Sequence, residues 1–111
     1  MQTTIHSSDF ALTDALESFT KQQVQQSMKK CSDKVEGLVI RLKSINGPQR
    51  EKECVVEVKL AQHAPVVVSK RSGDAYASIR AALSRASRTT LRRVSKRRLK
   101  RGEMSVQEND S

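Results

Sequence analysis

Four basic side chains recur at helical spacing in the C-terminal third of the chain. Arg85, Arg88, Arg92 and Lys96 follow one another at steps of three or four residues, which places them on one face of an α-helix. A guanidinium group binds two phosphate oxygens at once. Like charges at this spacing destabilise an isolated helix by roughly 0.2–0.5 kcal/mol per pair. The pattern predicts a helix that binds a polyanion; the alternative interpretation is a solvated charged face, and the one-sidedness of the charge counts against it.

The rest of the composition agrees with an anionic partner. The chain has 111 residues, the length of one domain, and 21 basic residues against 12 acidic ones, for a net charge of +9. This balance favours nucleic acid or an anionic surface. The aromatic residues are Phe10, Phe19 and Tyr76, with no tryptophan, so the sequence favours recognition of the nucleic-acid backbone over base reading. Tyr76 has helical spacing with Ile79, which predicts a core ring with its hydroxyl at the edge.

The sequence favours a binding protein over an enzyme. The acids are scattered and form no recognisable pair, and four glycines are too few for a phosphate-cradling loop. His6 and His63 are isolated, which makes metal ligation improbable. We therefore expect no catalytic residue, no cofactor, no metal ion and no small-molecule substrate.

The thiols and the apolar pattern indicate a cytoplasmic protein. Cys31 and Cys54 lack the spacing of a metal or redox motif, so we expect buried, reduced thiols rather than a disulfide. The first five residues lack the basic start and apolar core of a signal peptide. No apolar run reaches the roughly 18 residues of a membrane span.

The elements that position the basic face follow from periodicity. Residues 2–6 predict a strand, and Thr13 is expected to cap a helix that ends near Ser32. Residues 38–43 and 54–60 alternate apolar and charged side chains and predict a hairpin around a turn at 46–48. Residues 66–68 predict a short strand, and a second helix follows Asp74. Its apolar face combines Tyr76, Ile79, Leu83, Ala86, Thr90 and Val94.

The order β-α-β-β-β-α predicts an α+β fold. We expect a two-layer α/β sandwich, with two helices packed on one face of a four-stranded sheet. Residues 1–101 form this domain, and residues 102–111 are expected to be a disordered polar tail.

These elements and several short motifs resemble the ribosome hibernation-promoting factor and ribosome-associated inhibitor family. Leu12-Thr13-Asp14-Ala15-Leu16 is similar to the family's helix start, and Asp74, Tyr76 and Ile79 fit its D-x-Y-x-x-I pattern. The resemblance covers roughly residues 1–100. It departs from the family where Gln23 and Gln26 replace lysines and where Arg80 replaces an acid.

The resemblance implies a concrete function. Members of this family bind the small ribosomal subunit and its rRNA, in the channel used by mRNA and tRNA, and silence ribosomes under stress or in stationary phase. By resemblance the RNA-binding residues are Lys29, Arg71, Arg85, Arg88 and Arg92, and the helical row adds Lys96. The expected partner is the small subunit, and away from it the protein is expected to be a monomer. A generic double-stranded RNA- or DNA-binding module without a ribosomal role stays open as the alternative, as does an adaptor whose basic helix docks an acidic protein.

Overall fold

The computed structural model describes residues 2–8, 12–45 and 51–102, with side chains as far as residue 95. The elements follow the order β1 (Gln2–Ser7), α1 (Asp14–Ser27), a short 3-10 helix (Ser32–Lys34), β2 (Val35–Ile45), β3 (Glu51–Leu60), β4 (Val66–Ser72) and α2 (Ala75–Gly102). This order confirms the predicted α+β fold. The turn expected at 46–48 lies outside the described residues, and so does the tail expected at 102–111, except for Gly102 at the end of α2.

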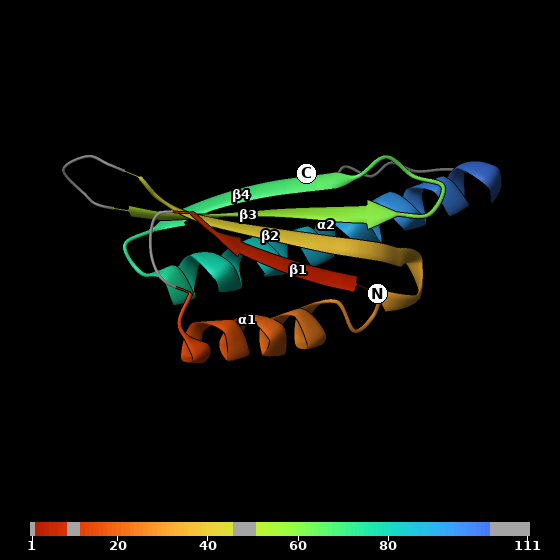
Figure 1. The fold of residues 1–111 in the computed structure, drawn as a ribbon. Helices are drawn as coiled ribbons and strands as arrows, with labels where there is room; N and C mark the ends of the chain where they lie inside the picture. Colours follow the sequence, from red (N-terminus) through yellow and green to blue (C-terminus); the bar gives the residue numbers. More distant parts are fainter. Residues whose placement is uncertain (1, 9–11, 46–50, 103–111) are drawn as a thin grey trace.

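A single four-stranded sheet forms one layer of the molecule. Its strands lie in the order β1-β2-β3-β4; β1 pairs with β2 in parallel, and the other two pairs are antiparallel. The parallel pair requires a crossover, which α1 provides. Both helices lie on one face of the sheet, and no described element covers the opposite face, which we call the uncovered face (Figure 1).

The core fills the space between the sheet and the helices. Alternate side chains of β2 and β3, such as Leu38, Ile40 and Val56, are fully buried, and Ile79 and Leu83 of α2 meet them from the helix layer. The intervening strand residues point to the uncovered face. There Arg41 pairs with Glu57 across β2 and β3 at 3.6 Å, so that opposite charges meet on neighbouring strands.

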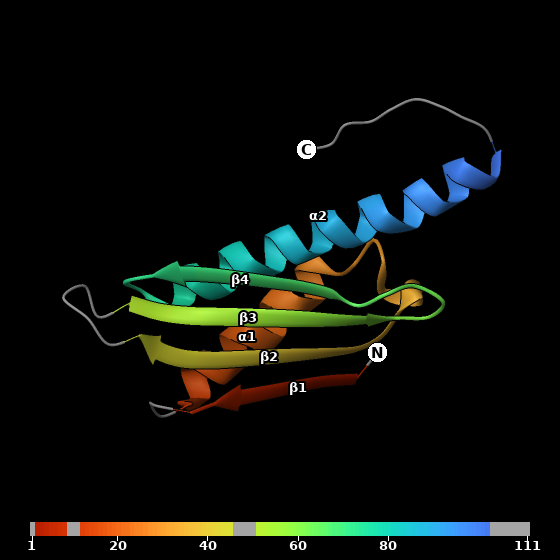
Figure 2. The same ribbon diagram turned by 90° about the horizontal axis from the view of Figure 1, so that it is seen from above.

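Local capping explains where the helices begin. The Thr13 hydroxyl accepts a hydrogen bond from the Leu16 amide at 3.1 Å, as predicted. The Asp74 carboxylate accepts one from the Tyr76 amide at 3.0 Å. Each bond satisfies an amide that the first turn of a helix leaves unpaired. From its start α2 runs along β3 and β4 and continues past the end of the sheet (Figure 2).

The predicted end of α1 near Ser32 is wrong, because α1 ends at Ser27. The Ser27 carbonyl accepts a hydrogen bond from the Ser87 hydroxyl of α2 at 2.6 Å. A longer helix would bond that carbonyl to the Cys31 amide, which instead donates to the Met28 carbonyl. Strand β4 also extends four residues beyond the predicted 66–68, since Ser69 to Ser72 continue the ladder with β3.

Candidate nucleic-acid interface

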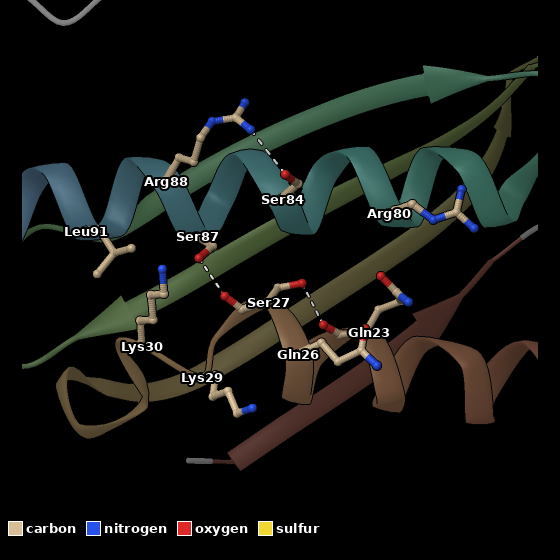
Figure 3. A pocket seen from close by; sticks show the side chains of 10 residues that line it. All are labelled: Gln23, Gln26, Ser27, Lys29, Lys30, Arg80, Ser84, Ser87, Arg88 and Leu91. Carbon is tan, nitrogen blue, oxygen red and sulfur yellow. Dashed lines mark hydrogen bonds between the residues drawn. The ribbon is translucent and has the colours of Figure 1, made fainter.

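A groove of about 490 Å³ runs between α1 and α2 (Figure 3). Its lining comes from the end of α1, from the turn after it and from α2. We call this surface the helix groove. Four of its ten lining residues are cations and none is acidic; the ten are Gln23, Gln26, Ser27, Lys29, Lys30, Arg80, Ser84, Ser87, Arg88 and Leu91.

Two serines fix the helices on either side of the groove. The Ser87 hydroxyl donates to the Ser27 carbonyl across the helices, and the Ser27 hydroxyl donates to the Gln23 carbonyl at 2.6 Å (Figure 3). These bonds use backbone acceptors of α1. The side-chain amides of Gln23 and Gln26 have no hydrogen-bond partner among the described residues, so they are available to a ligand.

The cations lie at different ends of the helix groove. Lys29 and Lys30 are exposed and follow the end of α1, whereas Arg80 lies on the N-terminal part of α2 (Figure 3). Arg88 points away from α1, and its guanidinium donates to the Ser84 hydroxyl at 3.1 Å. A polyanion lying along the groove would therefore meet positive charge at both ends.

Three of the predicted binding residues share the side of α2 that faces away from the sheet. Arg85, Arg88 and Arg92 are exposed, and at 100° per residue they lie within about 60° of one another around the helix axis. We call these three residues the outer arc. Arg85 has no ion pair or hydrogen bond with another described residue. Their position on one side of α2 agrees with the helical spacing found in the sequence, while an RNA-binding role for these residues stays a prediction. The Lys96 side chain lies beyond those described.

Arg71 lies on the opposite face of the molecule. It pairs in register with Glu53, and its guanidinium Nε lies 3.5 Å from the Glu53 carboxylate on the uncovered face of the sheet. The Ser69 hydroxyl donates to the same carboxylate at 2.8 Å. The Ser69 hydrogen bond and the Arg71 charge hold the pKa of Glu53 below its usual value. Of the predicted residues, Lys29 and Arg88 both line the helix groove, and Arg85 and Arg92 lie beside Arg88 on α2. Arg71 is separated from these four by the sheet.

An aromatic pair adjoins Arg80 at the end of the helix groove nearest the start of α2, which we call the N-terminal end of the groove. The rings of Phe19 and Tyr76 meet edge to face, with centroids 4.8 Å apart, and the Arg80 guanidinium carbon lies 5.5 Å from the Phe19 centroid. Phe19 packs against the core. The prediction of a core ring at Tyr76 is wrong: the residue is 37% exposed, and its ring packs edge to face with that of Phe19.

The buried thiols do not have the properties of a nucleophile. Cys31 and Cys54 are both free and buried. Burial, with a contribution from the Glu53 carboxylate, raises the pKa of Cys54 to about 12, and burial also raises that of Cys31. Such thiols remain protonated at neutral pH. Within the described parts of the chain, no group of three or more His, Cys, Asp or Glu residues is arranged to hold a metal ion, and no helix is long and apolar enough to cross a membrane.

Comparison with known families decides between a ribosomal protein and a generic nucleic-acid module. The model of the family described as sigma 54 modulation protein / S30EA ribosomal protein matches residues 3–98. The chain belongs to this family. The S30EA match covers β1 to α2 and so includes both sides of the helix groove. A search of curated proteins found no significant match.

Solved structures show the same S30EA fold. A ribosomal subunit interface protein from Coxiella burnetii superimposes with a TM-score of 0.72 at 18% identity, over 88% of this chain and 98% of that one. The N-terminal domain of Thermus thermophilus Protein Y gives a TM-score of 0.67 at 18% identity, over 80% of this chain and 93% of that one. At this identity the likeness establishes the fold.

Sequence reasoning missed part of the S30EA helix groove. Arg80, Ser84, Ser87 and Leu91 recur at steps of three or four, which marks a second polar face of α2 beside the outer arc. The dibasic pair Lys29-Lys30 after α1 also pointed to this face. Both signals were present, but the choice of α1 as the other wall of the groove required the fold.

Proposed function

We propose that this protein is a ribosome-associated translation inhibitor, or hibernation factor. It binds small-subunit rRNA in the mRNA and tRNA channel through the helix groove and the outer arc, and so blocks translation under stress or in stationary phase. Binding occurs as a monomer in the cytoplasm, and inhibition is steric because the bound protein occupies space that mRNA and tRNA need. Membership of the S30EA family supports the ribosomal partner.

One observation carries the choice of surface: the helix layer is cationic and its groove contains no acid. On the uncovered face of the sheet, Arg41 and Arg71 are paired with glutamates. In the helix groove all four charged side chains are positive, and Arg85 of the outer arc has no partner among the described residues. Cations without internal partners are the ones that gain most from phosphate contact, since binding releases the counterions condensed on RNA.

The test is cosedimentation of purified protein with separated small and large ribosomal subunits. We expect the protein to migrate with the small subunit at low salt and to be released at high salt. Reversal of the outer arc, with Arg85, Arg88 and Arg92 each changed to Glu, should abolish cosedimentation while circular dichroism stays native. It should also relieve the inhibition of a cell-free translation reaction programmed with mRNA.

A matched control carries the same change of charge on the uncovered face. Reversal of the exposed residues Arg41, Lys43 and Lys59 to Glu should leave cosedimentation in place. Unchanged cosedimentation of the outer-arc variant would remove this helix from the binding surface. Migration with the large subunit alone would contradict the proposed site.

A further inference from the structure

The N-terminal end of the helix groove differs chemically from the rest of it. At this end Arg80 lies over the ring of Phe19, and the Phe19 ring in turn packs edge to face with that of Tyr76. At the other end Lys29 and Lys30 provide flexible point charges. A surface that binds only phosphates needs positive charge and has no use for a flat platform. The difference between the two ends indicates two kinds of contact.

Arg80 is already oriented as such a platform. Its contact with Phe19 has the geometry of a cation–π interaction, which restricts the guanidinium before any ligand binds. The residue is exposed and lines the groove, so one side of this planar cation remains accessible. Among the described residues it has no carboxylate or carbonyl partner. Guanidinium planes, like aromatic rings, stack on unpaired bases.

Two amides lie beside this platform on the opposite wall. Gln23 and Gln26 line the groove from α1, and the side chain of Gln23 extends toward the part of α2 that carries Arg80 (Figure 3). Each amide offers both hydrogen-bond donors and an acceptor, the complement of a base edge. Both are free of hydrogen bonds to described residues.

The length of the groove suits a short piece of single strand. Arg80 and Arg88 are eight residues apart on α2, or about 12 Å at 1.5 Å per residue. Stacked bases rise by about 3.4 Å per nucleotide, so this distance spans roughly three nucleotides. One base at Arg80 therefore places the following phosphates at the other end of the groove, near Lys29 and Lys30.

We propose that the Arg80 end of the helix groove binds one unpaired RNA base, stacked on the Arg80 guanidinium and bonded at its edge by Gln23 and Gln26, while the lysine end binds phosphates. This inference rests on the proposed function for its choice of RNA. It adds base contact to a surface for which the sequence predicted backbone contact alone. Phe19 acts as a positioning residue, because it reaches the base only through Arg80.

The test compares two fluorescein-labelled RNA oligomers by anisotropy: octaadenylate and an abasic octamer with the same phosphates. We expect the protein to prefer octaadenylate by about 5- to 150-fold, the range for one stacked base. Arg80→Lys keeps the charge and removes the planar group, so the preference should fall to near onefold while the salt dependence stays the same. Phe19→Leu should weaken the preference in the same direction. Arg41→Lys on the uncovered face of the sheet is the matched control, since it makes the same change outside the proposed binding surface, and it should keep the preference.

Several outcomes overturn the inference. Equal affinity of the unmodified protein for octaadenylate, the abasic octamer and an octaglutamate peptide would mean that the groove takes any polyanion. A full base preference in Arg80→Lys would remove Arg80 from the contact. Either result, combined with normal cosedimentation on small subunits, leaves the ribosomal proposal intact. If the unmodified protein does not cosediment with small subunits but still prefers octaadenylate to the abasic octamer, the ribosomal proposal is refuted and this inference is supported.

Discussion

Neutralising the outer arc should lower the salt dependence of RNA binding by a predictable amount. Each phosphate contact to single-stranded RNA contributes about 0.7 to the slope of log affinity against log salt. Changing Arg85, Arg88 and Arg92 to Gln should therefore reduce the slope by about 2.1. Between 50 and 200 mM salt, the wild-type affinity should fall about 18-fold further than the affinity of the variant. All three residues are exposed, so we expect stability within about 0.5 kcal/mol of wild type.

The assay is filter binding of a single-stranded RNA oligomer over a salt series at fixed Mg²⁺. The control variant changes Arg41, Lys43 and Lys59 on the uncovered face to Gln, which removes the same formal charge. Its slope should match wild type, because contact and not net charge releases counterions. Equal slope changes in the two variants would refute the reasoning, since affinity would then follow overall charge and not the helix face.

Two further predictions concern stability. Thr90 is fully buried, and its hydroxyl has no hydrogen-bond partner among the described residues, so Thr90→Val should raise the free energy of unfolding in urea by about 1 kcal/mol. The control Thr89→Val, at a partly exposed position, should give little gain. A lower free energy of unfolding for Thr90→Val would contradict this reasoning. The pKa of Glu53 is lowered in the fold, so its stabilising contribution is present above the unfolded value near 4.5 and is lost as pH falls through the folded value. The free energy of unfolding of the wild type should exceed that of Glu53→Gln at pH 7, and unfolding curves in acid should show this difference shrinking below pH 4.5. A difference that persists in acid would contradict a role for the Glu53 charge.

Local signals in the sequence predicted most of the fold. The alternation in 38–43 and 54–60 and the capping side chains of Thr13 and Asp74 act over a few residues, so they are readable without the structure. The end of α1 was not readable. It depends on a hydrogen bond from Ser87 to Ser27, sixty residues apart in the chain.

The candidate site was predictable for one helix and not for its surroundings. The arc of Arg85, Arg88 and Arg92 follows from the helical period alone. The position of Arg71 on the uncovered face follows from the alternation after Val68, but only once the helices are known to cover the other side. The contact of Arg80 with Phe19 joins two helices and has no local signal.

The pairing of charges on the uncovered sheet has a consequence before any contact forms. On the uncovered face Arg41 and Arg71 are paired with glutamates, whereas the helix groove carries four cations and no acid, so the described residues give the protein an electric dipole across its two layers. In the field of a large polyanion this dipole experiences a torque that turns the helix layer toward the polyanion during diffusion. At physiological ionic strength the field is screened over about 8 Å, so the turning occurs in the last step of the encounter and raises the fraction of collisions that are productive.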